Sequence, residues 1–126
     1  MNQQVHVRQL SQPSVTRARG AEASVSLARL LDNGPIELEL DGVDLLSASF
    51  LDEIVRLLAK RSQIEKVTFV TDDILTLDKL KRISAVRNAR IYARGTHDAQ
   101  RIMLAPRQVA SGDSTFSASK VPTSWK

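Results

Sequence analysis

The stretch that decides the fold is residues 36–58, which read IELELDGVDLLSASFLDEIVRLL. Apolar and acidic residues alternate over 36–40, and strict alternation of this kind is typical of a strand with one buried face. The strand ends in an acidic loop, from which the tripeptide Ser47-Ala48-Ser49 leads into an amphipathic segment, 50–58. Apolar residues recur there at helical spacing. The stretch therefore predicts a strand, a loop and a helix in succession.

The same two patterns alternate outward from this stretch in both directions along the chain. Ser49, with Asp52 three residues later, predicts the N-terminal cap of the central helix. The further predicted elements are a strand over 4–8, a loop over 15–23, a helix over 24–31, strands over 66–70 and 89–93, and helices over 75–86 and 98–104.

This order predicts a single small α/β domain over 1–104, with a mixed, mostly parallel sheet and helices packed against it. The chain, at 126 residues, has room for one modest core. The first strand, near Val5, is expected at an edge of the sheet or antiparallel to its neighbour. Small and polar residues prevail from residue 105 onward, so 105–126 is expected to be a flexible polar and basic tail.

The composition excludes several kinds of site. No cysteine is present, which excludes disulfides, thiolate metal sites and a cysteine nucleophile. His6 and His97 are far apart in the chain and cannot by themselves form a metal site, and no cofactor is expected. No apolar run reaches the length of a membrane span, and the N-terminus lacks the apolar core of a secretory signal. The expected location is therefore the cytoplasm, with no membrane partner.

The usual catalytic motifs are missing from the sequence. No glycine-rich phosphate loop, H-E-x-x-H or G-x-S-x-G pattern occurs. Asp52 and Glu53 are adjacent on the predicted helix, so their side chains are expected to point in different directions, which argues against a paired-carboxylate acid–base site. Asp72 and Asp73 are expected to begin a helix, where acids suit the positive end of the dipole. The protein is predicted not to be an enzyme.

The charge is spread unevenly along the chain. A net charge of +4 and a pI of about 9.9 favour nucleic acid as a partner. Residues 31–85, however, carry seven bases and eleven acids, and the excess of bases lies toward the two ends. Only one Trp, one Tyr and three Phe are available to stack on bases. A nucleic-acid-associated accessory role, through the basic termini, is therefore the alternative function.

The segment Leu40 to Glu53 resembles the STAS-like family of small bacterial and phage domains, which carry a strand, a short D-G-V turn and an S-S-S-F helix start. The block Ser47-Ala48-Ser49-Phe50-Leu51-Asp52-Glu53 is the distinctive part. Upstream, the spacing Pro13-x-x-Thr16-Arg17-x-x-Gly20 is similar to an arginine-containing loop of that family. More distantly, the chain resembles the anti-anti-sigma factors. The resemblance implies a regulatory module that binds a protein partner, such as a histidine-kinase-like ATPase.

In anti-anti-sigma factors, a serine in an Asp-Ser-Ser-Gly turn is phosphorylated, and the added charge acts on the partner interface. When that turn is laid on this chain, the acceptor position falls on Ala48, which has no hydroxyl. Ser47 and Ser49 are then the candidate phosphorylation sites. The alternative is structural, with Ser49 as a helix cap and Ser47 as a loop residue. Arg17 is expected to pair with an acidic group near Asp41 or Asp44.

The resemblance and the helix pattern together predict one partner-binding surface. It comprises the loop before the helix and the exposed face of the helix itself. The predicted contact residues are Arg17, Asp44, Ser47, Ala48, Ser49, Asp52, Glu53 and Arg56.

Overall fold

The computed structural model describes residues 2–10, 16–43 and 45–104. Asp44 and the expected C-terminal tail, 105–126, lie outside the described residues. The elements in chain order are β1 (Gln3–His6), η1 (Val7–Gln9), α1 (Arg17–Leu31), β2 (Ile36–Glu39), α2 (Ala48–Lys60), η2 (Ile64–Lys66), β3 (Val67–Val70), α3 (Ile74–Arg87), β4 (Ile91–Arg94) and β5 (Ile102–Leu104).

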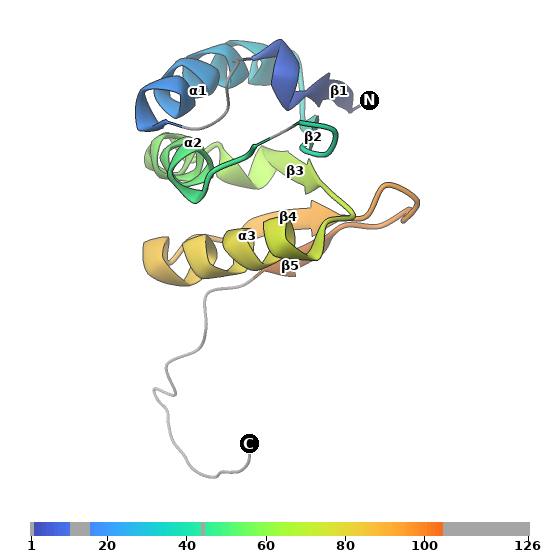
Figure 1. Ribbon diagram of the computed structural model, residues 1–126. Coiled ribbons are helices and arrows are strands. Elements are labelled where there is room, and N and C mark those ends of the chain that lie inside the picture. The colour runs from blue at the N-terminus through green and yellow to red at the C-terminus, as the bar shows by residue number, and fades with distance from the viewer. Residues whose placement is uncertain (1, 11–15, 44, 105–126) are drawn as a thin grey trace, which may run out of the picture.

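The strands form one five-stranded sheet in the order β1-β2-β3-β4-β5 (Figure 1). β1 to β4 are parallel to one another, and β5 is antiparallel to β4. The predicted α/β fold, with a mixed and mostly parallel sheet, is confirmed. β1 lies at an edge, as expected, and runs parallel to β2 with Val5 opposite Leu38. The antiparallel strand is β5, at the other edge.

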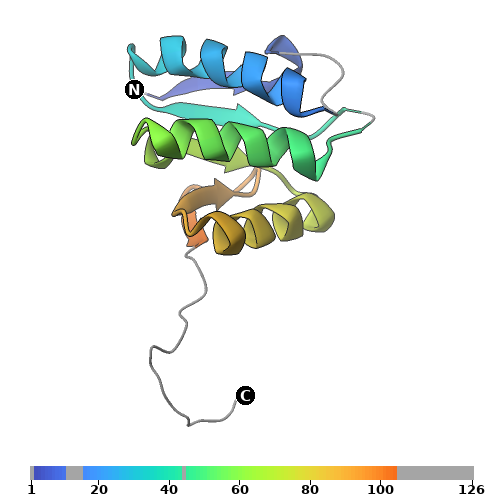
Figure 2. The ribbon, with the colours of Figure 1, turned by 90° about the vertical axis from the view of Figure 1, so that its left-hand side faces the viewer.

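All three helices lie side by side on one face of the sheet, as Figures 1 and 2 show from two directions. Each helix connects one strand to its immediate neighbour, and every step goes in the same direction across the sheet. Crossovers of this type share one hand, so successive steps in one direction place their helices on the same side. α2 is therefore the middle helix, packed against both α1 and α3.

The core lies between the sheet and α2. Ile36, Leu38 and Leu40 of the alternating stretch are at most 1% exposed. They meet the apolar face of α2, in which Phe50, Leu51, Ile54, Val55 and Leu58 are fully buried. The strand and the helix of the 36–58 stretch bury their apolar faces against one another, and this contact forms the centre of the core.

The opposite face of the sheet carries no helix from the described residues and is covered by long side chains. Arg94 pairs with Glu37 across the face at 2.9 Å. Arg101 reaches back from the start of β5 and stacks over the Tyr92 ring, 3.7 Å from its centroid. Parallel sheets are usually covered on both faces, and here these paired polar side chains take the place of a second helical layer.

The expectation of a loop over 15–23 is wrong, because α1 begins at Arg17. Thr16 caps the helix, with its Oγ1 accepting from the backbone N–H of Arg19 at 3.1 Å. The segment has no clean apolar period because the side it turns toward α2 consists of small residues, among them the buried Gly20 and Ala23. Close packing of small residues leaves no hydrophobic periodicity to read.

The expected helix over 98–104 is also wrong. Its second half forms β5, in which Ile102 pairs with Ala93 and Leu104 with Ile91. Leu104 is buried, and its carbonyl accepts a hydrogen bond from the buried hydroxyl of Ser84 on α3. Three apolar residues in a row are too few to distinguish a strand from a helix by period, and pairing with β4 decides the outcome.

Gly20 permits the close approach of α1 to α2. A Cβ atom at this position would lie 2.6 Å from the carbonyl oxygen of Phe50 and 2.9 Å from the Cβ of Glu53. Neither neighbour is the far end of a flexible side chain, so a larger residue forces the helices apart.

Substitution of Gly20 by alanine is expected to lower the free energy of unfolding by about 1–3 kcal/mol, as overpacking does in cores. Helix propensity alone predicts the opposite sign, a gain of about 1 kcal/mol. Urea denaturation followed by circular dichroism measures the difference. Ala18→Gly, on the exposed side of the same helix, is the matched control for propensity. A Gly20→Ala protein as stable as the wild type contradicts the role of Gly20 at this contact.

Candidate partner-binding site

Ser47, and not Ser49, caps α2. The Ser47 Oγ accepts a hydrogen bond from the backbone N–H of Phe50 at 3.1 Å. Ala48 and Ser49 lie in the first turn and are exposed. The predicted capping box is wrong because Asp52 is bound to arginines of the other two helices and does not reach back to the helix start.

Asp52 is the centre of an ion cluster that joins all three helices. Arg17, at the start of α1, donates to Asp52 Oδ2 at 2.7 Å. Arg87, in the last turn of α3, binds the same carboxylate with two hydrogen bonds, of 2.8 and 2.6 Å. Glu53 also contacts Arg17, at 3.3 Å, and holds Arg56 through a second two-bonded pair. These five residues are called the three-helix ion cluster below.

The expectation that Asp52 and Glu53 lie on an exposed helix face is wrong, because each residue is only 8% exposed. Their side chains also do not diverge, since both reach the same Nη1 atom of Arg17. Arg56 remains partly accessible beside them. Of the predicted contact residues, the structure thus brings Arg17, Asp52, Glu53 and Arg56 together, in a contact between helices.

Both carboxylates are held in their charged forms. Hydrogen bonds from Arg87, and then from Arg17, lower the pKa of Asp52 to about 2, against the opposing effect of burial. Hydrogen bonds from Arg56 likewise lower the pKa of Glu53. A carboxylate that stays ionised and fully paired is a poor proton acceptor near neutral pH. The arrangement is suited to joining helices rather than to acid–base chemistry.

Arg17 does not pair with Asp41, contrary to expectation, and Asp44 lies outside the described residues. Asp41 connects two loops instead. Its Oδ1 accepts from the Thr71 hydroxyl at 2.6 Å, and its Oδ2 accepts from the backbone N–H of Asp72 at 2.7 Å. These bonds fix the loop after β2 against the loop after β3, at the carboxyl ends of the strands.

Exposed aliphatic side chains lie beside this fixed loop. Leu45 is 62% exposed, and Ile74 and Leu75, in the first turn of α3, are 76% and 67% exposed. Leu45 and Leu75 both line a cavity of about 320 Å³ between the 40–46 loop and α3. Lys79 closes one side by donating to the Leu46 carbonyl at 2.8 Å. Leu45, Ile74 and Leu75 are called the aliphatic patch below.

Sequence reasoning missed the aliphatic patch and Arg87. The signal for the patch was present, because Ile74 and Leu75 fall outside the apolar stripe of their helix and follow two acids directly. Leu45 gave a weaker signal, because Val43 and Leu46 make its loop partly apolar. Arg87 carried no such signal, since a base in the last turn of a helix is ordinary.

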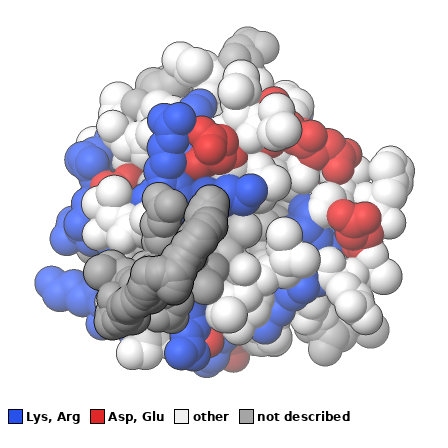
Figure 3. Space-filling model, turned by 90° about the horizontal axis from the view of Figure 1, so that it is seen from below, with Lys and Arg blue, Asp and Glu red and all other residues white. Residues whose placement is uncertain are grey.

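Acidic and basic side chains are separated along the strand direction. Acids follow the strands, as with Asp41, Asp72 and Asp98, whereas bases gather where the helices end, as with Lys60 and Arg90. One face of the molecule shows the separation directly, with most blue atoms on the left of Figure 3 and most red atoms toward its upper right.

The nucleic-acid alternative rests on the two basic ends of the chain. In the N-terminal part, Arg17 and Arg19 are held in ion pairs with acids. The C-terminal bases of this hypothesis, in 105–126, lie outside the described residues.

The described residues contain no group of three or more His, Cys, Asp or Glu that could hold a metal ion. Among the helices within 2–10, 16–43 and 45–104, none has the length and hydropathy to cross a membrane. The strand order does not reverse anywhere in the sheet, so the sheet lacks the crevice at which open α/β folds bind ligands.

Removal of the Asp52 charge is expected to cost about 1–2 kcal/mol of unfolding free energy at neutral pH. The folded pKa, about 2, lies below the ordinary value of 3.8, so the stabilisation is present above about pH 4 and is lost as the pH falls toward 2. The stability of Asp52→Asn should therefore fall less steeply than that of the wild type over this range. Urea denaturation at several pH values measures both effects.

Asp78→Asn is the matched control, because Asp78 pairs only with Arg82 on the exposed side of α3. It should change stability little at any pH. If Asp52→Asn and Asp78→Asn behave alike, the three-helix ion cluster does not hold the helices together.

Substitutions at Ser47 and Ser49 are expected to differ in their effect on stability. Ser47→Ala removes the cap of α2 and should lower the unfolding free energy by about 1 kcal/mol, while Ser47→Asp, another good cap, should restore most of it. Ser49→Ala should be nearly neutral, because its exposed side chain caps nothing. Thermal denaturation of the three variants is sufficient, and a larger loss in Ser49→Ala contradicts the assignment of the cap.

Comparisons with known proteins identify no relative of the chain from which a function could be inferred. No family model, no curated protein and no solved structure gives a significant match to the chain.

Proposed function

We propose that the protein is a non-enzymatic regulatory module of the cytoplasm that binds a protein partner through the aliphatic patch and the adjoining start of α2. The observation that carries the proposal is the exposure of Leu45, Ile74 and Leu75, each more than 60% accessible. Leu45 and Leu75 line one cavity, and Ile74 directly precedes Leu75 in the first turn of α3. Clustered exposed aliphatic side chains are a common mark of protein interfaces.

The surface beside the patch is held by hydrogen bonds at Asp41 and Leu46, which supports its use in recognition. Asp41 holds the beginning of the loop after β2 against the loop after β3, and Lys79 of α3 holds the Leu46 carbonyl at its end. A surface that is ordered before binding loses little conformational entropy when a partner docks. The patch and the loop therefore present a preformed apolar contact.

The nature of the partner rests on the resemblance to STAS-like domains. Ser47-Ala48-Ser49-Phe50 begins the helix at the position where those domains meet their partners, so a histidine-kinase-like ATPase is the proposed partner class. The three-helix ion cluster supports the contact indirectly, because it fixes α2 between its neighbours. Asp52 and Glu53 are positioning residues in this proposal, and they do not contact the partner.

Ser49 is the better candidate for a phosphorylation switch. Its side chain is exposed in the first turn of α2, four residues after Leu45, whereas the Ser47 hydroxyl is engaged as the cap. A phosphate adds a charge of about −2. That charge suits the positive end of the helix but must lose water when an apolar partner surface covers it. Phosphorylation of Ser49 is therefore expected to release the partner.

The test is affinity purification of the tagged full-length protein from its native cells, with mass spectrometry of the recovered proteins. Leu45→Asp combined with Leu75→Asp should abolish recovery of the partner, because charges enter an apolar contact. Val86→Asp is the matched control, since Val86 is equally apolar, 78% exposed and on the outer part of α3. It should leave recovery unchanged.

A partner lost from the double variant and kept by the control supports the surface, and an ATPase domain in that partner supports the proposed class. Ser49→Asp should weaken recovery and Ser49→Ala should not. A partner retained by the double variant overturns the surface assignment.

A further inference from the structure

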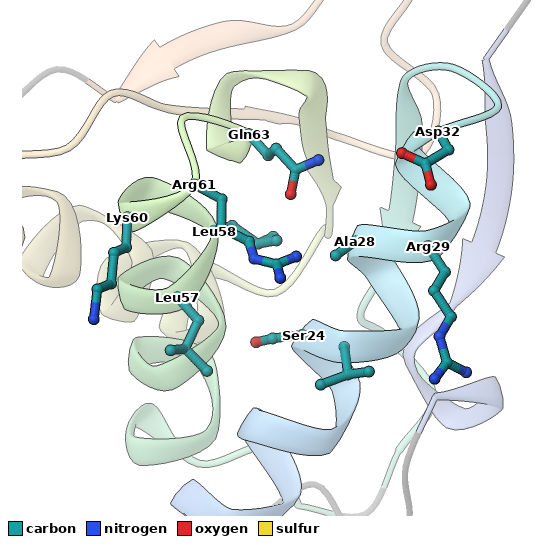
Figure 4. Close-up of a pocket in the computed structure, with 10 residues that line it drawn as sticks. Ser24, Ala28, Arg29, Asp32, Leu57, Leu58, Lys60, Arg61 and Gln63 are labelled. Atoms are coloured by element: carbon teal, nitrogen blue, oxygen red, sulfur yellow. The ribbon is translucent and has the colours of Figure 1, made fainter.

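A second groove lies at the opposite end of α2 from Ser47. It runs between the C-terminal halves of α1 and α2 and encloses about 690 Å³ (Figure 4). The floor is apolar, with Ala28 and Leu58 buried, and Val25, 53% exposed, is on the α1 wall. The outward-facing side of a surface helix is ordinarily polar and charged, so an apolar floor in an open groove is unusual.

The groove carries an excess of positive charge that nothing in the described chain neutralises. Arg29, Lys60 and Arg61 line it with Asp32 as the only acid. None of the three bases has an ion pair or side-chain hydrogen bond among the described residues, unlike Arg17, Arg56 and Arg87 in the three-helix ion cluster. In Figure 4 the Arg61 guanidinium lies between the two helices, while Arg29 and Lys60 extend along their outer sides.

An unsatisfied acceptor lies at one end of the same groove. The Gln63 Oε1 atom is buried without a hydrogen-bond partner, and Gln63 is one of the lining residues. Buried acceptors in folded proteins are nearly always paired. A donor from outside the described chain would satisfy it.

We infer that the groove between α1 and α2 binds a short acidic amphipathic segment of another protein. The apolar stripe of such a segment would cover Val25 and the half-buried Leu57. Its carboxylates would lie toward Arg61 between the helices and toward Arg29 and Lys60 at the two outer edges (Figure 4). The Gln63 amide would turn its Oε1 atom toward the groove to accept from a backbone or amide N–H of the segment. This is recognition of a helix in a groove. Complementarity to the basic groove requires the ligand to be negatively charged.

The dimensions and the charge restrict the occupant. The α1 wall runs from Ser24 to Asp32, which spans about 12 Å at 1.5 Å per residue, enough for about two turns of helix. The chain's own residues 105–126 have the wrong sign, because they carry Arg107, Lys120 and Lys126 against Asp113 alone. The occupant is therefore expected from a second protein, at a surface separate from the aliphatic patch.

The test is an NMR titration of the ¹⁵N-labelled full-length chain with a synthetic peptide of about ten residues, in which leucines recur every three or four positions between glutamates. Saturable shifts are expected at the groove residues. The same peptide with glutamine for every glutamate should bind about tenfold more weakly or worse, because the charge contacts are lost.

Charge reversal supplies the matched comparison. Arg29→Glu, Lys60→Glu and Arg61→Glu together should weaken binding of the acidic peptide about tenfold or more. Lys66→Glu, Lys81→Glu and Arg90→Glu together change the net charge equally at exposed positions outside the groove and should leave the affinity within about twofold. All six side chains are exposed, so both triple variants should keep the fold, which circular dichroism verifies.

Three results overturn the inference. The first is equal weakening by the two triple variants, which means nonspecific attraction to net positive charge. The second is equal binding of the glutamine peptide, or no saturable shift in the groove. The third is a change in the groove signals on dilution of the free protein, which assigns the surface to a second copy of this chain. Loss of the aliphatic patch by Leu45→Asp and Leu75→Asp should not affect the titration, so this inference and the proposed function fail independently.

Discussion

The packing of the three helices against one another centres on a single carboxylate. Asp52 receives Arg17 from the first helix and Arg87 from the third, and it lies on the helix between them. Helices that lie side by side on one face of a sheet are each held by the sheet beneath, but their relative position needs a lateral contact. Arg17 and Arg87 supply this lateral contact by binding Asp52 from α1 and from α3. The close approach at Gly20 reinforces the contact between α1 and α2.

The two ends of α2 differ in chemistry because of how the chain winds. Loops that follow strands collect at one end of the sheet, and helix ends collect at the other. Acids suit the helix starts and bases suit the helix ends. The ordinary charge preferences of helix ends are therefore enough to separate acids from bases along the strand direction. The middle of α2 is buried in contacts within the domain, which leaves its two ends as the accessible surfaces.

The alternating stretch 36–40 and the amphipathic segment after it are sufficient to predict the fold class, because both periods are strong and mutually consistent. The errors occur where tertiary contacts override a weak local pattern. Residues 17–23 are helical through small side chains at a close contact, and 102–104 pair with β4 although the run is too short to show a period.

The candidate site was predictable only in part. Ser47, Ala48 and Ser49 were identified, but which serine caps the helix depends on the burial of Phe50 and on the partners of Asp52. Charge alone does not reveal that Asp52 is buried, since its two arginines come from positions 35 residues away on either side in sequence. The aliphatic patch joins one loop residue to the first turn of α3 and becomes a surface only in the folded chain.

The one-directional winding also determines how the domain assembles. Every strand pairs only with the strands before and after it in the sequence, so no sheet contact spans more than about one strand–helix unit. Such a chain resembles a short repeat protein, in which stability is the sum of units and their nearest-neighbour interfaces. The β2-α2-β3 unit has neighbours on both sides, so it is expected to form first, and the edge strands β1 and β5 are expected to form last and to fray first.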